Sequence, residues 1–239
     1  VRVPGYGEGT VIGYKSSRFG KGNHVIEFDP SAQTAWVEPG VVLDELNAFL
    51  KPHGLWFPVD VSTGSRATIG GMTGNNSCGA RSLHYGTMRD NVIAIDAILA
   101  NGTEMHFGEL PADTSKAGFS PEQCDMIEAL LALGVREAAE INARFPKMMR
   151  RVGGYNIDAL VPSNKPINLS HLLVGSEGTL AYSKQIKIKL SVLPKHKVLG
   201  ICHFPTFYEA MDSAQHLVKL DPAAVELVDN TMIGLAREI

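Results

Sequence analysis

The stretch Thr68–Gly86, TIGGMTGNNSCGARSLHYG, constrains the fold of this chain more than any other part of the sequence. Five of its nineteen residues are glycine, and Asn75, Asn76, Ser77 and Cys78 lie among them. Glycine loses the most conformational freedom on folding, and short polar side chains compete for backbone hydrogen bonds. This composition disfavours both helix and strand, so we predict an irregular segment with accessible backbone.

Accessible backbone of this kind suits the diphosphate of a dinucleotide-type cofactor. Glycine lets several main-chain N–H groups approach one anion, and Asn and Ser add short donors. The stretch lacks the G-x-G-x-x-G turn that opens a helix, and it lacks the G-K-[ST] end of a P-loop. Neither a Rossmann nor a Walker site is therefore predicted. An irregular surface loop without a ligand is the alternative.

The composition is typical of a globular chain. It has 239 residues, 44% of them hydrophobic and 20% charged, with a net charge of −3. These values argue against a disordered chain and against a nucleic-acid surface. The apolar runs are shorter than a membrane span, and the start does not resemble a signal peptide. Three isolated cysteines (Cys78, Cys124 and Cys202) have neither metal-ligand nor disulfide-framework spacing, which favours a cytoplasmic setting.

Hydrophobic periodicity predicts helices and strands in the first two thirds of the chain. Strands are predicted at 24–29, 34–40 and 184–194, and a hairpin at 91–107 around Asn101-Gly102. Helices are predicted at 41–54, with Val42, Leu46, Phe49 and Leu50 on one face, at 120–134, with a Ser120/Gln123 capping box, and at 135–146.

The pattern changes after Pro194. Strands are predicted at 196–205 and 223–229, and between them a helix with a Thr206/Glu209 capping box; a further helix starts at the cap Asn230. We therefore predict a domain over 1–194 and the beginning of a second over 195–239. Because the chain starts at Val1 and stops inside a helix, we expect a fragment of a longer protein.

Two blocks of sequence resemble a known family. PVDVSTGSRATIGGMTGNNSCGARSLHYG, followed by DNV and later by VGSEGTLAYSKQIKIKL, is similar to the FAD-binding domain of the p-cresol-methylhydroxylase and vanillyl-alcohol-oxidase type. Within that superfamily the chain most resembles D-lactate dehydrogenases, the flavin subunit of glycolate oxidase and D-2-hydroxyglutarate dehydrogenases. The resemblance covers most of residues 20–239. It implies an α+β fold in which a PCMH-type FAD-binding domain precedes the start of an α+β substrate (cap) domain.

The resemblance also implies which residues contact FAD. Those expected near the isoalloxazine and ribityl groups are Pro58, Ser62 and Thr63. Those expected along the ribityl chain and diphosphate are Thr68, Gly70, Gly71, Asn75, Ser77, Cys78 and Gly79. The second block is expected near the adenosine end, with Gly175, Glu177 and Gly178.

The chain departs from the family pattern at two places. Ala181 stands where a glycine usually follows the second block. The earlier glycine-rich loop is matched only loosely by 3–13, and most of the usual N-terminal subdomain before it is absent. We therefore expect the 239-residue chain alone not to turn over substrate.

Several side chains near these blocks have a functional and a structural interpretation. Cys78 is either a flavin attachment or redox thiol, or a small residue packed against the cofactor. His84 is either a covalent flavin anchor or an ordinary loop histidine. Arg81 and Arg89 either offset the diphosphate charge or form surface ion pairs.

Two further groups have similar alternatives. The segment 150–160, RRVGGYNIDAL, suits a loop facing a carboxylate substrate, because arginine binds carboxylates bidentately; Arg151 and Tyr155 are the candidate substrate residues. Glu226 and Asp229 are either a pair of catalytic carboxylates or capping residues beside a short strand.

The implied reaction is oxidation of a 2-hydroxy acid to a 2-keto acid, with hydride transfer to flavin N5 while a base takes the hydroxyl proton. In the relatives the base and a metal site lie downstream of residue 239, so no catalytic residue and no metal ligand is assigned. The implied partners are the small-molecule substrate and an electron acceptor, either a fused or a separate iron–sulfur protein that could hold the enzyme at a membrane surface. Another FAD-dependent alcohol oxidase and a non-catalytic interaction module are the alternatives.

Overall fold

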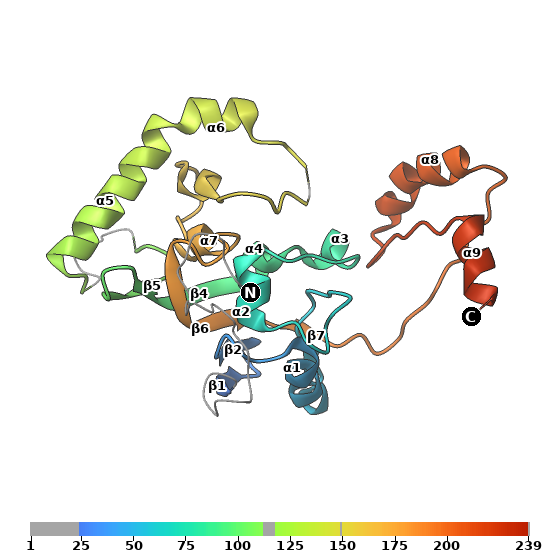
Figure 1. The fold of residues 1–239 in the computed structure, drawn as a ribbon, viewed down its shortest axis with the longest axis horizontal. Helices are drawn as coiled ribbons and strands as arrows, with labels where there is room; N and C mark the ends of the chain where they lie inside the picture. Colours follow the sequence, from blue (N-terminus) through green and yellow to red (C-terminus); the bar gives the residue numbers. More distant parts are fainter. Residues whose placement is uncertain (1–23, 112–117, 149, 239) are drawn as a thin grey trace.

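The computed structural model describes residues 24–111, 118–148 and 150–238 (Figure 1). This part of the chain has an α+β fold built on a five-stranded antiparallel sheet of order β1-β2-β6-β4-β5, beside a two-stranded sheet of β3 and β7. The strands are β1 (Val25–Asp29), β2 (Thr34–Val37), β3 (Leu55–Trp56), β4 (Val92–Leu99), β5 (Glu104–Phe107), β6 (Ala181–Lys189) and β7 (Ser191–Val192).

In the part of the chain that the structure describes, no helix is long and apolar enough to cross a membrane. The α-helices are α1 (Leu43–Leu50), α2 (Ile69–Gly74), α3 (Ser82–Tyr85), α4 (Met88–Asn91), α5 (Pro121–Arg136), α6 (Ala138–Arg144), α7 (Ser170–Leu173), α8 (Phe207–Leu217) and α9 (Asn230–Arg237). The 3₁₀ helices are η1 (Lys51–His53), η3 (Ile157–Leu160) and η4 (Val218–Leu220).

The central strand β6 carries the alternation that the sequence predicts. Ile186 and Ile188 are buried, whereas Lys187 and Lys189 lie on the opposite face, as the two-residue period of a strand requires. Ile186 pairs with Val37 of β2 on one side and with Ile95 of β4 on the other. One face of the sheet therefore forms the core.

The predicted hairpin at 91–107 is confirmed. β4 and β5 pair antiparallel, and Gly102 takes the left-handed conformation (φ 85°) that the tight turn needs. The Asn101 side chain accepts a hydrogen bond from the amide of Thr103 at 3.0 Å, which stabilises the turn.

Helix α1 is also confirmed, with two changes. Leu46 and Leu50 are buried, but Phe49 is 42% exposed and packs edge-on against Phe28. The turn η1 lies between α1 and Gly54, and Gly54 ends it in a left-handed conformation (φ 69°). Phe49 lies at the edge of the buried face because neighbouring positions on a helix differ by about 100°.

The prediction that the glycine-rich stretch Thr68–Gly86 is irregular is wrong, because it contains α2 and α3. Thr68 caps α2 by accepting from the amide of Gly71, and Ile69 and Met72 are buried in the core. Burial of these apolar side chains outweighs the low helix propensity of the glycines.

Helix α5 starts with the predicted capping box, because Ser120 accepts from the amide of Gln123 and Gln123 accepts from that of Ser120. α5 packs against η3 so closely that a Cβ on Gly134 would lie 2.1 Å from the carbonyl oxygen of Leu160. The predicted separate helix after residue 134 starts only at Ala138, because α5 continues to Arg136.

The segment after β7 differs from its prediction. The Thr206/Glu209 capping box of α8 is confirmed, but 196–205 and 223–229 form no strands. A strand needs a partner for its main-chain N–H and C=O groups, and no described strand lies beside either segment. Figure 1 shows α8 and α9 lying away from the five-stranded sheet.

Helix α9 is capped by Asp229, not by Asn230. The Asp229 carboxylate accepts from the amide of Met232 at 2.7 Å, which favours its capping interpretation over a catalytic one. The loosely matched glycine loop at 3–13 lies outside the described residues.

Candidate functional site

The N-terminal end of α2, where the sequence predicts cofactor contacts, has its first amides engaged within the protein. These amides do not provide a free anion site, because each already donates to an acceptor in the fold. The three hydrogen bonds are Ile69 N to the Val41 carbonyl at 2.8 Å, Gly70 N to the Pro39 carbonyl at 2.8 Å, and Gly71 N to Thr68 Oγ1 at 3.2 Å.

The C-terminal end of α2 meets the second predicted block. The amide of Gly175 donates to the carbonyl of Thr73 at 2.9 Å, and the amide of Glu177 donates to that of Gly74 at 3.0 Å. Gly175, Glu177 and Gly178 all have positive φ angles, of 81°, 55° and 72°. The fold thus joins the two blocks through main-chain hydrogen bonds, in a turn that uses left-handed conformations.

Asn76 lies at this junction and has an unused donor. Its side chain is buried, its φ is 49°, and its Oδ1 accepts from the amide of Arg89 at 3.0 Å. Its Nδ2 is buried and has no hydrogen-bond partner among the described residues. Because the Arg89 amide can only donate, the Asn76 atom that faces it must be the oxygen. The other end of the side-chain amide is therefore Nδ2, a donor without a partner in the described part of the chain.

Of the two adjacent asparagines, the cofactor contact predicted from the sequence is Asn75, and Asn76 is not among the predicted contacts. Asn75 is exposed, and Asn76 is buried. Asparagine adopts the left-handed conformation more readily than most residues, but this preference applies equally to both positions, so residue type alone does not distinguish them.

At two of the predicted contact positions, atoms of the protein itself explain why the residue is glycine. A Cβ on Gly79 would lie 2.0 Å from the carbonyl oxygen of Asp60, and a Cβ on Gly71 would lie 3.1 Å from Thr68 Oγ1. Gly79 is therefore required where two backbone segments pass each other. Its amide donates to Ser82 Oγ at 3.0 Å.

The remaining residues of the first block lie in different environments. Pro58 is buried, whereas Ser62 and Thr63 are exposed in the loop before α2. Ser77 and Cys78 are half-buried, and Ser77 is held at both its amide and its carbonyl, which bond to Met72 and Met88.

Arg151 and Tyr155, the candidate substrate residues, both have partners in the chain. Arg151 Nη2 lies 2.5 Å from Asp158 Oδ1, and its guanidinium stacks over Phe145 at 4.5 Å. The Tyr155 hydroxyl lies 2.8 Å from Thr179 Oγ1. To bind a substrate carboxylate, Arg151 would have to share its guanidinium with Asp158.

The other cationic candidates also form contacts within the protein. Arg89 Nη1 lies 2.8 Å from Asp158 Oδ2. Arg81 Nε lies 3.9 Å from Asp60 Oδ2, and its guanidinium stacks over Trp56 at 5.0 Å. His84 Nδ1 lies 3.2 Å from Asp221 of the C-terminal segment. These contacts agree with the ion-pair interpretation of both arginines.

Two titratable groups behind the junction have shifted pKa values. Burial raises the pKa of Asp158, but hydrogen bonds and charge from Arg89 and Arg151 outweigh it, so the pKa lies below its ordinary 3.8. Burial, followed by the charge of Arg89, lowers the pKa of His171 from 6.5 to about 4, against the opposing charges of Asp90 and Asp158. His171 is therefore neutral at neutral pH.

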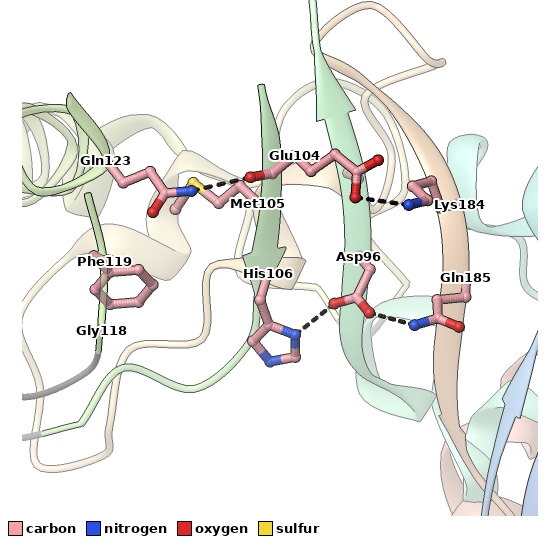
Figure 2. A pocket seen from close by; sticks show the side chains of 10 residues that line it. Asp96, Glu104, Met105, His106, Gly118, Phe119, Gln123, Lys184 and Gln185 are labelled. Carbon is pink, nitrogen blue, oxygen red and sulfur yellow. Dashed lines mark hydrogen bonds and ion pairs between the residues drawn. The ribbon is translucent and has the colours of Figure 1, made fainter. Parts of the chain in front are cut away.

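A cavity of about 310 Å³ lies elsewhere, over β4, β5 and β6 (Figure 2). Its polar side chains bond to one another: His106 Nδ1 lies 2.6 Å from Asp96, Asp96 accepts from Gln185, and Lys184 lies 2.7 Å from Glu104. Groups that already satisfy one another offer little to a ligand, so the cavity is not the candidate site.

The cavity and the core lie on opposite faces of the sheet. Asp96 pairs with His106 and Gln185, whereas the adjacent residue of β4, Ile95, pairs with Phe107 and with Ile186. Because successive side chains of a strand point to opposite faces, the cavity lies across the sheet from these buried residues.

Two protein families match the chain in the order that the sequence analysis expected. Residues 9–108 match the FAD binding domain, and residues 193–239 match the C-terminal domain of FAD linked oxidases. Together these ranges cover more than half of the chain. The chain belongs to the FAD-linked oxidases. FAD is the cofactor that both families indicate.

Curated relatives agree with this membership. The chain is 33% identical over 218 residues to a D-2-hydroxyglutarate dehydrogenase of Pseudomonas putida, covering 90% of this chain and 22% of the relative. It is 32% identical over 199 residues to a mitochondrial D-lactate dehydrogenase [cytochrome] of Arabidopsis thaliana, covering 82% and 26%. It is 29% identical over 213 residues to the glycolate oxidase subunit GlcD of Bacillus subtilis, covering 87% and 34%. The chain thus spans about a fifth to a third of the length of these relatives.

A solved structure has a similar fold. Alkyldihydroxyacetonephosphate synthase aligns with a TM-score of 0.51 at 19% identity, over 85% of this chain and 28% of the other. At this identity the likeness concerns the fold alone.

The junction between α2 and the second block fits an FAD-binding family. It has a buried unpartnered donor on Asn76, and main-chain turns at Gly175 and Gly178 in conformations that suit glycine. Neutral and main-chain donors of this kind are those that hold a diphosphate or a ribityl hydroxyl. The N-terminal end of α2 lacks such free donors.

Proposed function

We propose that the protein containing this chain is an FAD-dependent oxidoreductase that oxidises a D-2-hydroxy acid to the corresponding 2-keto acid. The observation that carries the proposal is the joint match to the FAD binding and FAD linked oxidase families, with relatives that include D-2-hydroxyglutarate and D-lactate dehydrogenases. A hydroxy acid of the lactate, glycolate or 2-hydroxyglutarate type is the substrate that these relatives support.

We propose that FAD is held by Asn76 together with the turn of Gly175, Glu177 and Gly178. The unpartnered Nδ2 of Asn76 supports this assignment, and so do the positive φ angles of the turn. The amides of Cys78 and Gly178 donate to no described residue, which leaves them available as well. When bound, FAD supplies the two-electron redox chemistry, and the chain supplies position and water exclusion.

The other predicted contacts are proposed to have two different roles, one in shaping the backbone and one in facing the substrate. Thr68, Gly70, Gly71 and Gly79 shape the backbone around the cofactor, because their groups are already bonded or tightly packed within the protein. Arg151 and Tyr155 are proposed to face the substrate through the parts of their side chains that Asp158 and Thr179 leave open.

The proposed domain boundary lies near Pro194. β7 ends at Val192, the following residues form no strand with the sheet, and the match to the C-terminal oxidase family starts at residue 193. We assign 1–194 to the FAD-binding domain and 195–239 to the beginning of the substrate domain.

Two further proposals concern the electron acceptor and the cell compartment. We propose an iron–sulfur protein, either fused or separate, as the acceptor, on the strength of the family resemblance. A cytoplasmic location is proposed because Cys78, Cys124 and Cys202 are free thiols.

The full-length protein should be purified and scanned for flavin absorption, then assayed with D- and L-2-hydroxy acids and an artificial electron acceptor. We expect bound FAD and turnover with a D-acid only. A colourless protein that takes up no added FAD would leave a non-catalytic module as the better interpretation. Turnover of simple alcohols in preference to hydroxy acids would instead indicate an alcohol oxidase.

The 239-residue chain alone is expected not to turn over substrate when FAD is added. It matches the C-terminal oxidase family over 193–239 and spans about a fifth to a third of the length of the curated relatives, and positioning of the substrate is expected to need the remaining part. The same assay measures this, and activity close to that of the full-length protein would place the active site inside 1–239.

A further inference from the structure

A network of four side chains lies behind the proposed flavin contact. Asp158 bridges two arginines: its Oδ2 lies 2.8 Å from Arg89 Nη1, and its Oδ1 lies 2.5 Å from Arg151 Nη2. Asn156 Oδ1 accepts from the same two guanidinium groups, at 3.2 and 3.4 Å. We call Arg89, Arg151, Asn156 and Asp158 the Asp158 network. None of its members is more than about a quarter exposed, so it is weakly screened by solvent.

The network connects to both halves of the junction. On one side, the amide of Arg89 donates to Asn76 Oδ1. On the other, Asn156 Nδ2 donates to the carbonyl of Val174 at 2.8 Å, directly before Gly175. A Cβ on Gly175 would lie 3.2 Å from Asn76 Cβ and 3.5 Å from Asn156 Nδ2, so these groups are in close packing.

We propose that Asp158 is a positioning residue for flavin binding: by holding Arg89 and Arg151 it fixes Arg89 on α4, and thereby keeps the Nδ2 donor of Asn76 aimed at the cofactor. The inference rests on the proposed function. Asp158 itself does not touch FAD in this account. Its effect passes through the Arg89 amide, which orients the Asn76 side chain, and through Asn156, which holds the second block.

Two alternative roles for Asp158 would give different results. If Asp158 only stabilised the fold, its loss would lower the free energy of unfolding, and its effect on the FAD Kd would be the same with or without the Asn76 side chain. If Asp158 only neutralised Arg151, its loss would free that guanidinium and would change substrate affinity, not flavin affinity. A dependence of flavin affinity on both Asp158 and Asn76 separates the proposed role from these alternatives.

The test is a double-mutant cycle in the full-length protein with Asp158→Asn, Asn76→Gly and both changes together, measuring the FAD Kd by flavin fluorescence. Glycine is used at position 76 because it accepts the φ of 49° there. Asn76→Gly is expected to raise Kd roughly tenfold, Asp158→Asn roughly threefold to tenfold, and the double variant no more than Asn76→Gly alone.

The matched control is Glu104→Gln, which removes a carboxylate that pairs with Lys184 at 2.7 Å at the distant cavity. It should leave the FAD Kd unchanged. Additive effects of the two test changes, or an unchanged Kd in Asp158→Asn, would overturn the proposal.

A second measurement tests the network without flavin. The Arg89 amide is expected to exchange its hydrogen faster in Asp158→Asn than in the wild type, because its bond to Asn76 is less well held. Unchanged exchange would also overturn the proposal. A wild-type protein that binds no FAD, with faster Arg89 exchange in the variant, would instead contradict the proposed function and leave the network as a purely structural link.

Discussion

The two ends of α2 carry similar sequences and have different environments. At the N-terminal end, Thr68 and the amides that follow it donate and accept entirely within the protein. At the C-terminal end, Asn76 keeps a buried donor without a partner, and the turn of Gly175 and Gly178 lies against the helix. Both ends have the glycine-rich composition that suggests anion binding, yet only one has donors to offer. A glycine in such a stretch can serve the packing of the protein or the approach of a ligand, and only the neighbouring atoms distinguish these uses.

Gly79→Ala is expected to have the largest effect, because Gly79 is required for the packing of the protein. Its Cβ would lie 2.0 Å from the Asp60 carbonyl oxygen, so backbone must move, at about 3 kcal/mol or more of unfolding free energy. The variant should lose folded protein and flavin together. Urea unfolding of Gly79→Ala beside Gly153→Ala, whose Cβ would meet nothing within 4 Å, measures this. Normal stability with selective loss of FAD would instead show that Gly79 is needed for the approach of the cofactor.

The next largest effect concerns His171 and the dependence of the free energy of unfolding on pH. The pKa of His171 is 6.5 in the unfolded chain and about 4 in the folded protein, so the folded state resists protonation. Its contribution is complete above pH 6.5 and is lost as the pH falls towards 4, by about 2–3 kcal/mol between pH 7 and pH 4.5. The contribution of Asp158 is complete above pH 3.8 and is lost as the pH falls below that value, because its pKa in the folded protein is lowered.

His171→Gln should therefore show a smaller loss of unfolding free energy over this range than the wild type. Urea unfolding of the full-length protein at pH 7.0 and pH 4.5 gives the comparison, with His84→Gln as the control on the exposed side of the molecule. Equal losses in wild type and His171→Gln would mean that the region behind the junction is better hydrated than its packing indicates.

Asn76→Gly compared with Asn75→Gly tests the C-terminal end of α2 directly. Removal of the Asn76 donor is expected to weaken FAD binding roughly tenfold, the size of one hydrogen bond, whereas loss of the exposed Asn75 should change it less than twofold. Isothermal titration of FAD into each full-length variant provides the measurement. Equal losses, or a larger loss for Asn75→Gly, would restore the assignment made from sequence.

Thr68→Ala is the smallest expected effect and tests the N-terminal end. The change removes a helix cap, which costs about 1 kcal/mol of unfolding free energy, and removes no contact to FAD in the proposed arrangement. The melting temperature should fall by a few degrees while the FAD Kd stays the same. A loss of FAD affinity that exceeds the loss of stability would show that Thr68 contacts the cofactor.

Local signals predicted the elements that depend on local chemistry. The Asn101-Gly102 turn, the Ser120/Gln123 box and the alternation along β6 specify their structures through short-range hydrogen bonds and side-chain period, and each is confirmed. The segments 196–205 and 223–229 have strand-like patterns, but a strand also needs a neighbour, which a local pattern does not contain.

The site was predicted less completely, for a related reason. Motif order correctly identified the FAD-linked oxidases, and the two blocks do come together in the fold. The burial of Asn76 and the partner of Arg89 depend on contacts between residues far apart in sequence. The Arg89–Asp158 pair and the Asn156–Val174 bond become visible only when three segments of the chain are placed together.

The position of β6 in the sheet also bears on how the chain reaches this structure. β6 lies between β2 and β4, yet it follows both in the sequence, so about 150 residues separate its Ile186 from the partner Val37. During synthesis the β1–β2 and β4–β5 hairpins emerge first, each with an unsatisfied edge that only β6 can fill. Completion of the sheet therefore waits for residues 181–189 to leave the ribosome. Until then the two hairpins are the parts of the nascent chain most exposed to wrong pairing.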